Sequence, residues 1–280
     1  MKKITVLLLL FIAVKASAQK SVLFKMKYLP QHTYNILMNM KGNIKADLSG
    51  NQEILEKLKE QGITMPLAAV ISAKTTGTTK TGVLAADNSF PLAMTFQVEQ
   101  PSMILNGKST PIPMQQKPAT TIYAHILSDG TIKGDSISGK KGDTTSGKSA
   151  LKMMNTVQKQ IKFPDHPMHV GESFTQDIPF NMPMNMGTKS VELKTVYTLV
   201  SITGGKAYFD MTQTIDMKMN VQQSQLNITG AGTGKMVYSI KDNFPISYAS
   251  SINMNVNGDV SSVDVNGTFE LNMDFKYDIN

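Results

Sequence analysis

The chain has 280 residues, a formal net charge of +7, 20 methionines, and neither cysteine nor tryptophan. Without cysteine there can be no disulfides, thiolate metal sites, iron–sulfur clusters or cysteine nucleophile. With 41% hydrophobic and 18% charged residues, the composition is typical of a globular protein and not of a disordered chain or a multi-span membrane protein. All 28 cationic residues are lysines, and they form no dense block. Because arginine is the residue best suited to bidentate contacts with bases and phosphates, we expect no nucleic-acid binding.

Residues 1–18 have the three parts of a secretory signal peptide. Two lysines begin the segment, an apolar run follows over 6–14, and a small-residue cleavage site ends at Ala18. The apolar run is about half of the ~20 residues that span a bilayer, which favours cleavage over a retained anchor. We therefore expect a mature chain that begins at Gln19, carries no transmembrane anchor and lies in the periplasm or outside the cell. Losing three lysines lowers the formal charge from +7 to +4.

The first half of the mature chain alternates apolar and polar residues in several segments. A period of two predicts β-strands with one buried face. The segments with this pattern are 22–28, 34–44, 92–98 and 122–127.

Two helices and two loops interrupt these strands. Residues 51–61 place apolar side chains on one side and have Gly62 after their end, and residues 149–162 show the same helical spacing. The polar stretches 74–82 and 134–148 are predicted to be mobile loops.

The region from residue 191 to the C-terminus shows the clearest pattern. Residues 263–279 alternate strictly between apolar and polar side chains, which predicts a long strand with one face in water. Four further segments, 191–202, 209–221, 228–240 and 246–256, repeat this pattern. They predict an antiparallel meander of five strands, each longer than the usual ~5–6 residues. Turn residues predict its hairpins at 204–205, 222–225, 243–245 and 257–259.

Long strands with one apolar face must cover that face. We therefore predict a mainly β (α+β) fold, in which a long, curved antiparallel sheet or half-barrel packs two short helices. The signal peptide at 1–18 would precede a single β-rich domain over 19–280, with two halves joined near 163–174. A sandwich is the alternative architecture.

Two short motifs suggest enzymes, but their surroundings do not fit. Residues 142–149 match the phosphate-loop pattern, yet a polar, glycine-rich stretch precedes them instead of a buried strand. Residues 134–137 are similar to the start motif of a serine esterase family, which needs that serine near the mature N-terminus at a strand-to-helix turn. We therefore expect no enzymatic activity and no cofactor.

A cluster of histidine and methionine provides a metal hypothesis. His166 and His169 lie shortly before Met182, Met184 and Met186. Imidazole and thioether groups are ligands that copper prefers, so His166, His169, Met182 and Met184 form a candidate copper site. The same i, i+2 spacing of methionines recurs elsewhere without histidine, which favours methionine as a core or pocket residue.

Residues 163–174 contain Phe-Pro, a second proline, and then Val-Gly-Glu-Ser-Phe. With this FP…P…VGESF turn between two β-rich halves, the chain resembles a group of uncharacterised secreted bacterial proteins. That group has no established activity, so the resemblance implies no catalytic residues. More distantly, a long meander with helices is similar to lipoprotein-carrier half-barrels, which hold acyl chains in an apolar concavity; fold alone does not establish function.

The methionine-rich faces of the strands lead to the functional hypothesis. Flexible methionine side chains adapt to variable acyl chains better than branched side chains do. We expect a secreted or periplasmic, non-enzymatic protein that binds a lipid or an acyl chain in an apolar concavity. The alternatives are an envelope structural or interaction protein without a ligand, and the copper-binding protein. The residues expected to line the site are Met182, Met184, Met186, Met217, Met219, Met254 and Met273.

Overall fold

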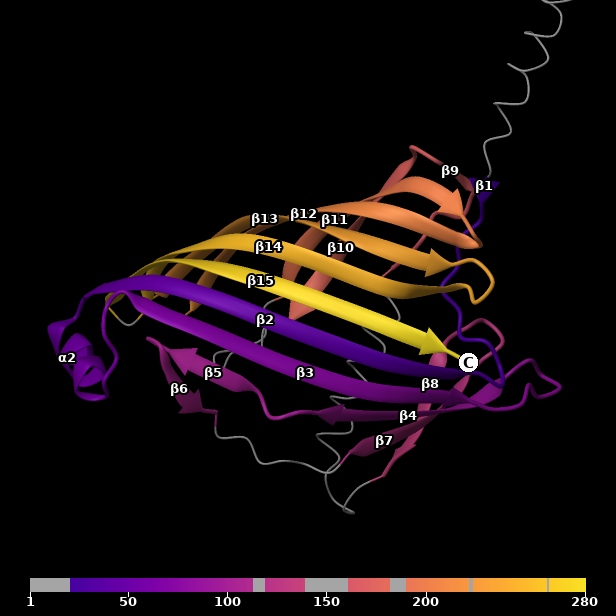
Figure 1. Ribbon diagram of the computed structural model, residues 1–280, viewed down its shortest axis with the longest axis horizontal. Helices are drawn as coiled ribbons and strands as arrows, with labels where there is room; N and C mark the ends of the chain where they lie inside the picture. Colours follow the sequence, from indigo (N-terminus) through magenta and orange to yellow (C-terminus); the bar gives the residue numbers. More distant parts are fainter. Residues whose placement is uncertain (1–20, 113–118, 139–160, 182–189, 222–223, 261) are drawn as a thin grey trace, which may run out of the picture.

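One antiparallel sheet of 13 strands dominates the protein, as the computed structural model shows (Figure 1). The structure describes residues 21–112, 119–138, 161–181, 190–221, 224–260 and 262–280. The first half of the chain contributes β1 (Ser21–Val22), β2 (Thr33–Gly50), the helix α2 (Gln52–Glu60), β3 (Leu67–Thr81), β4 (Phe90–Val98), β5 (Ser102–Leu105), β6 (Lys108–Pro111), β7 (Thr120–Ile126) and β8 (Ile132–Ile137). The second half contributes β9 (Met168–His169), β10 (Ser173–Asn181), β11 (Ser190–Thr203), β12 (Lys206–Val221), β13 (Ser224–Ser239), β14 (Phe244–Val260) and β15 (Val263–Ile279).

The strands follow the order β10-β11-β12-β13-β14-β15-β2-β3-β4-β7-β8, and β5 pairs with β3 and with β6. The last strand, β15, pairs with β2 from Val263–Gly50 to Ile279–Tyr34, so strands from both ends of the chain share one sheet. Within the described residues, the outermost strands β10 and β8 do not pair with each other. The sheet is therefore curved but open (Figure 1). These features confirm the mainly β fold class and the five-strand C-terminal meander, β11–β15.

The two faces of this sheet differ because successive strand residues point in opposite directions. On β12, Phe209, Met211, Ile215 and Met217 are buried, whereas their neighbours in sequence are exposed or, for Tyr208, half-buried. We call the face that carries these residues the inner face, and the opposite one the outer face. The pairing register extends both faces to every strand from β11 to β4.

Glycine allows side chains from neighbouring strands to meet across β13. Gly234 lies on the inner face between Met211 of β12 and Ser250 of β14. A Cβ atom at this position would lie 2.4 Å from the Met211 Cε and 2.9 Å from the Ser250 Cβ. The side chains of β12 and β14 therefore occupy the space that a side chain on β13 would need.

An aromatic cluster fills the inner face beneath the start of β12 and the end of β13. Phe24 packs against Phe163, Phe209 and Tyr238 with ring centroids 5.1–5.3 Å apart. Phe24 and Phe163 come from segments outside the large sheet, so these segments cover the sheet from the inside. Two other core clusters lie on the inner face, one beneath β11–β15 and one beneath β4, β7 and β8.

The covering segment corrects the strand predicted at 22–28. Only Ser21–Val22 forms a strand, β1, which pairs with β9. The alternation in this segment is nevertheless meaningful, because Phe24 is buried and Met26 packs against the same cluster. Beyond Val22, residues 23–28 form no strand, although one side of the segment is apolar and packs on the cluster.

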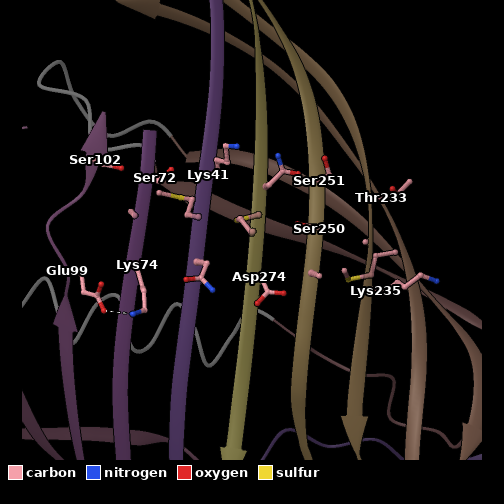
Figure 2. A pocket seen from close by; sticks show the side chains of 18 of the residues that line it. Lys41, Ser72, Lys74, Glu99, Ser102, Thr233, Lys235, Ser250, Ser251 and Asp274 are labelled. Carbon is pink, nitrogen blue, oxygen red and sulfur yellow. Dashed lines mark ion pairs between the residues drawn. The ribbon is translucent and has the colours of Figure 1, made fainter. Parts of the chain in front are cut away.

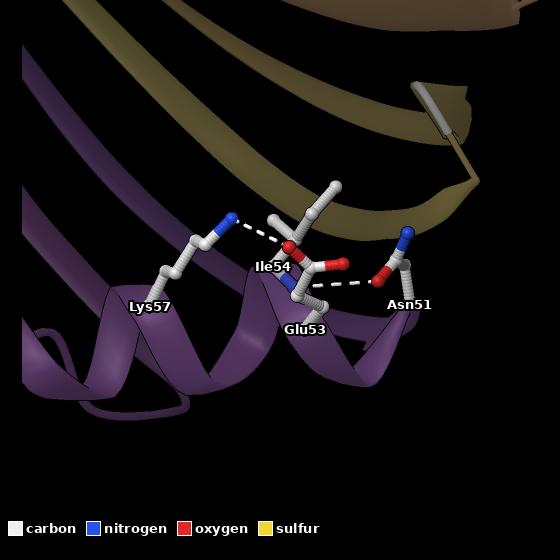
Figure 3. A network of polar contacts seen from close by, with 4 residues as sticks. All are labelled: Asn51, Glu53, Ile54 and Lys57. Atoms are coloured by element: carbon white, nitrogen blue, oxygen red, sulfur yellow. Dashed lines mark hydrogen bonds and ion pairs between the residues drawn. The ribbon is translucent and has the colours of Figure 1, made fainter.

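The N-terminal helix lies where the sequence predicts it. Asn51 caps α2 by accepting a hydrogen bond from the backbone N–H of Ile54 at 3.3 Å, and Lys57 pairs with Glu53 at 2.6 Å (Figure 3). No residue of α2 is buried, so the helix lies at the margin of the sheet and is not packed firmly on it. The second predicted helix, 149–162, falls almost wholly outside the described residues.

Of three further predictions about loops and turns, two are wrong and one lies partly outside the described residues. The loop predicted at 74–82 is wrong, because all but its last residue belongs to β3, a central strand between β2 and β4. The first four residues of the loop predicted at 134–148 belong to β8 (Ile132–Ile137), and residues from 139 onward are outside the description. The turn predicted at 257–259 is also wrong: β14 continues to Val260, which pairs with Val263.

No helix in the described part of the chain is both long enough and apolar enough to cross a lipid bilayer.

Candidate ligand-binding surface

The inner face carries no charged residue over most of the sheet. In β2–β4, β7, β8 and β11–β15, the register places no Asp, Glu, Lys or His of the described residues on this face. Charged residues in these strands lie on the outer face or in turns. Since burying an unpaired charge is costly, this segregation makes the inner face an apolar surface.

The middle of the inner face is incompletely covered. On β15, β2 and β3, most inward side chains between the core clusters are only half-buried, and Met40 is 38% exposed. We call this region the apolar strip. Its residues are Met38, Met40, Ile44, Ile71, Ala73, Phe269, Met273 and Phe275.

One row of paired residues connects the apolar strip to the covered part of the inner face. Met211 pairs with Gly234, Gly234 with Ser250, Ser250 with Met273, and Met273 with Met40. Met211 at one end is 1% exposed, whereas Met40 at the other end is 38% exposed. The row thus passes from a closed core to an accessible apolar surface.

A group of uncharged polar side chains lies beside this row. Gln213 is 1% exposed, and its Nε2 donates to the hydroxyl of Tyr248 at 3.0 Å. The Gln213 Oε1, the Thr195 Oγ1 and the Tyr197 hydroxyl make no hydrogen bond within the described part of the chain. The Ser250 Oγ is also buried and makes no hydrogen bond within the described part of the chain. Buried polar atoms without partners are rare in folded proteins, so this group has unused hydrogen-bonding capacity.

Burial on the inner face raises the pKa of several tyrosines. Burial raises the pKa of Tyr197, of Tyr248 and of Tyr277 above the ordinary value. Burial raises the pKa of Tyr238 to about 12, although hydrogen bonding to the backbone of Lys25 opposes the shift. These shifts have the sign expected for acids removed from water.

The predicted site residues do not lie together in one site. Met273 lies in the apolar strip, whereas Met217 and Met254 are buried in the core cluster beneath β11–β15. Met219 lies on β12 opposite Leu226, but its side chain is not described. Met182, Met184 and Met186 fall outside the described residues.

Sequence reasoning did not place Met38 and Met40 in the site. Both alternate with polar residues on β2, so their inward direction was predicted. Their position beside Met273 depends on the pairing of β15 with β2, which joins residues more than 230 positions apart in sequence. Alternation within a strand carries no information about which strand lies next to it.

The two histidines of the copper hypothesis are not part of the apolar strip. His166 and His169 are exposed, and the His169 Nδ1 lies 3.3 Å from the Glu172 Oε1. The described residues contain no group of three or more His, Cys, Asp or Glu that could hold a metal ion. Met182 and Met184 are outside the description, so the hypothesis stays a prediction.

A hollow of about 1020 Å³ crosses the middle of the long strands (Figure 2). Its residues include the inward row from Met211 to Met40, but none of the inward residues two positions further along any strand. Its other walls are outward-facing polar side chains, such as Lys41, Lys74 and Lys235. The hollow therefore lies on the outer face, behind the apolar strip, and differs from the apolar concavity expected from the sequence.

Comparisons with known proteins give little guidance. No family model matches the chain, and no curated protein matches it. Among solved structures, the T2SS secretin XcpQ from Pseudomonas aeruginosa, determined by cryo-EM, matches with 10% sequence identity and a TM-score of 0.20. The alignment covers 99% of this chain and 63% of the secretin chain. A TM-score this low does not establish a shared fold.

Proposed function

We propose that the protein is a secreted or periplasmic, non-enzymatic protein that binds a hydrophobic ligand, a lipid or an acyl chain, on the inner face of its sheet. The observation that carries this proposal is the apolar strip: a half-buried, uncharged surface across the centre of a curved sheet. An apolar ligand lying there would remove this surface from water, which is worth roughly 25 cal/mol per Å² of apolar area.

The chemistry of the strip suits ligands of variable shape. Met38, Met40 and Met273 are unbranched side chains that can change rotamer to follow an acyl chain. The Gln213 Oε1 and the Tyr197 hydroxyl, which accept or donate no hydrogen bond within the described residues, lie on neighbouring strands of the same face. They could bond an uncharged polar group of the ligand, such as an ester or amide.

Two measurements test the proposal directly. Native mass spectrometry of the purified mature protein, followed by organic extraction, should reveal a co-purifying lipid or fatty acid. Titration with a fluorescent fatty acid should show saturable binding. A protein that carries no extractable lipid and binds no fluorescent fatty acid would contradict the proposal.

A matched pair of variants locates the site. Met40→Lys places a charge on the apolar strip, whereas Asn39→Lys places the same charge one residue away on the outer face. We expect Met40→Lys to weaken fatty-acid binding by about tenfold or more, since a charge facing an acyl chain costs at least the ~1.4 kcal/mol that corresponds to tenfold. Asn39→Lys should bind like the unmodified protein, and equal losses in both variants would place the ligand elsewhere.

A further inference from the structure

The hollow on the outer face is bounded by two complete rows of outward-facing residues. In the first row, each residue is the register partner of the next across seven strands: Thr212, Thr233, Ser251, Asn272, Lys41, Ser72 and Ser102. The second row runs parallel to it through Asp210, Lys235, Ala249, Asp274, Asn39 and Lys74, and Glu99 follows beside Lys74. We call the hollow between these rows the outer groove (Figure 2).

The outer groove runs across the strands and not along them. Strands in a sheet lie about 4.8 Å apart, so the six steps of the first row span roughly 29 Å. Each step offers a hydroxyl, an amide or an ammonium group. The groove is therefore long and regular, with one hydrogen-bonding group for each strand that it crosses.

The charges in the groove balance. Lys74 pairs with Glu99 at 2.6 Å, and Lys235 pairs with Asp210 at 3.0 Å. The two other charged groups of the groove, Lys41 and Asp274, have opposite signs, and Asp274 pairs with Lys276 at 3.5 Å. The groove thus offers no net charge to attract an acidic or a basic polymer.

A carboxylate outside the groove fixes one of its amides. Glu270 accepts hydrogen bonds from Asn272 Nδ2 and from Asn43 Nδ2, both at 2.9 Å. These bonds hold the pKa of Glu270 below its usual value, the one from Asn272 being the larger cause. These bonds orient the Asn272 amide, whose Oδ1 can accept a hydrogen bond from a ligand.

We propose that the outer groove binds a linear, uncharged glycan that lies across the strands. A chain of sugars offers hydroxyl groups at regular intervals, which matches a row of hydroxyl, amide and ammonium groups with no net charge. This site is separate from the apolar strip, since the two lie on opposite faces of the sheet.

Other extended polymers fit the groove less well. A peptide that adds a strand needs a free sheet edge, whereas β12–β15, β2 and β3 have partners on both sides. Nucleic acids and acidic glycans require uncompensated cations, and here Lys74 and Lys235 are paired with carboxylates.

Isothermal titration of the mature protein with cellohexaose and with chitohexaose tests the proposal, and alginate serves as the charged glycan. We expect saturable binding of at least one neutral hexasaccharide and weaker or absent binding of alginate. The proposal is overturned if neither hexasaccharide binds at millimolar concentration, or if alginate binds more tightly than both.

A matched pair of double variants assigns binding to the groove. Lys41→Ala with Asn272→Ala removes two neighbouring groups of the first row. The control, Lys45→Ala with Asn255→Ala, removes the same residue types on the same face. Lys45 lies four positions beyond Lys41 on β2, and Asn255 lies four positions beyond Ser251, the β14 partner of Asn272. We expect the first variant to lose about tenfold or more in hexasaccharide affinity, which corresponds to ~1.4 kcal/mol, because it removes two hydrogen-bonding groups of the groove. The second variant should keep its affinity.

Two further outcomes would contradict this assignment. Equal losses in both double variants would place glycan binding outside the groove. Sedimentation analysis that shows a dimer broken only by Lys41→Ala with Asn272→Ala would instead make the groove an interface between two copies. Fatty-acid binding in the same variants gives an independent check, because the apolar strip should be unaffected if the two sites are separate.

Discussion

The aromatic-covered region and the apolar strip are two parts of one inner face with different degrees of closure. In the covered region, Phe24 and Phe163 from outside the sheet seal Phe209 and Tyr238. Over the strip, the described residues supply no comparable cover, and Met40 stays 38% exposed. The apolar pattern of the strands is the same in both, so within the described residues the two regions differ in the presence of a covering segment.

Because of this difference, we expect side chains of the covered region to contribute mainly to stability and side chains of the strip mainly to ligand binding. Side chains in the covered region contribute to the folded state through close packing, and each loss there leaves a cavity. Side chains in the strip are already partly in water, so their removal costs the fold less while removing surface from a ligand.

The largest effect is expected for Met211→Ala. Met211 is 1% exposed and belongs to the aromatic cluster. Replacing a buried methionine by alanine lowers the free energy of unfolding by about 2–5 kcal/mol, because transfer energy is lost and a cavity remains. Urea denaturation followed by circular dichroism measures this change, and a loss below 1 kcal/mol would show that Met211 is not enclosed.

Gly234→Ala should have the next largest effect. The added Cβ would lie 2.4 Å from the Met211 Cε and 2.5 Å from the backbone oxygen of Ala249. Overpacking of this kind costs about 1–3 kcal/mol. Thr233→Ala, at the neighbouring outward position, is the control and should change the free energy of unfolding by less. A Gly234→Ala variant as stable as the control would show that β12 and β14 do not crowd the space over β13.

Alkaline pH should weaken the covered region progressively. Burial raises the pKa of Tyr238 from 10.0 to about 12, so the folded state holds this proton more tightly than the unfolded state does. The resulting stabilisation is complete below pH 10 and is lost as the pH rises from 10 towards 12. In Tyr238→Phe, the free energy of unfolding should fall less steeply over this interval. Equal slopes in the variant and the unmodified protein would show that Tyr238 does not titrate abnormally.

The fold was largely predictable because its strands are long and strictly alternating. Residues 263–279 show this most clearly, and β15 covers Val263–Ile279. β3 was missed, and its second half was predicted to be a loop, because that half is rich in threonine on both faces, so Thr76 and Thr79 give no apolar alternation. The pairing of β3 with β2 and β4, and not its own pattern, makes it a strand.

The candidate site was less predictable than the fold. The inward direction of Met254 and Met273 follows from the alternation, but Met254 is buried in a core cluster and Met273 reaches the apolar strip. The difference depends on what covers each position, which is decided by segments distant in sequence. The outer groove likewise arises from register across seven strands, and no single strand shows it.

The smallest effect on stability is expected for Met40→Ala, the counterpart of Met211→Ala in the same inner-face row. Met40 is 38% exposed, so the substitution removes less buried surface and leaves a site open to solvent instead of a closed cavity. We expect a loss of less than about 1 kcal/mol in the free energy of unfolding, by the same urea measurement. Fatty-acid affinity should fall in this variant nonetheless, because the thioether side chain belongs to the proposed binding surface. A loss as large as that of Met211→Ala would mean that Met40 is part of a closed core, and the division between the two regions would fail.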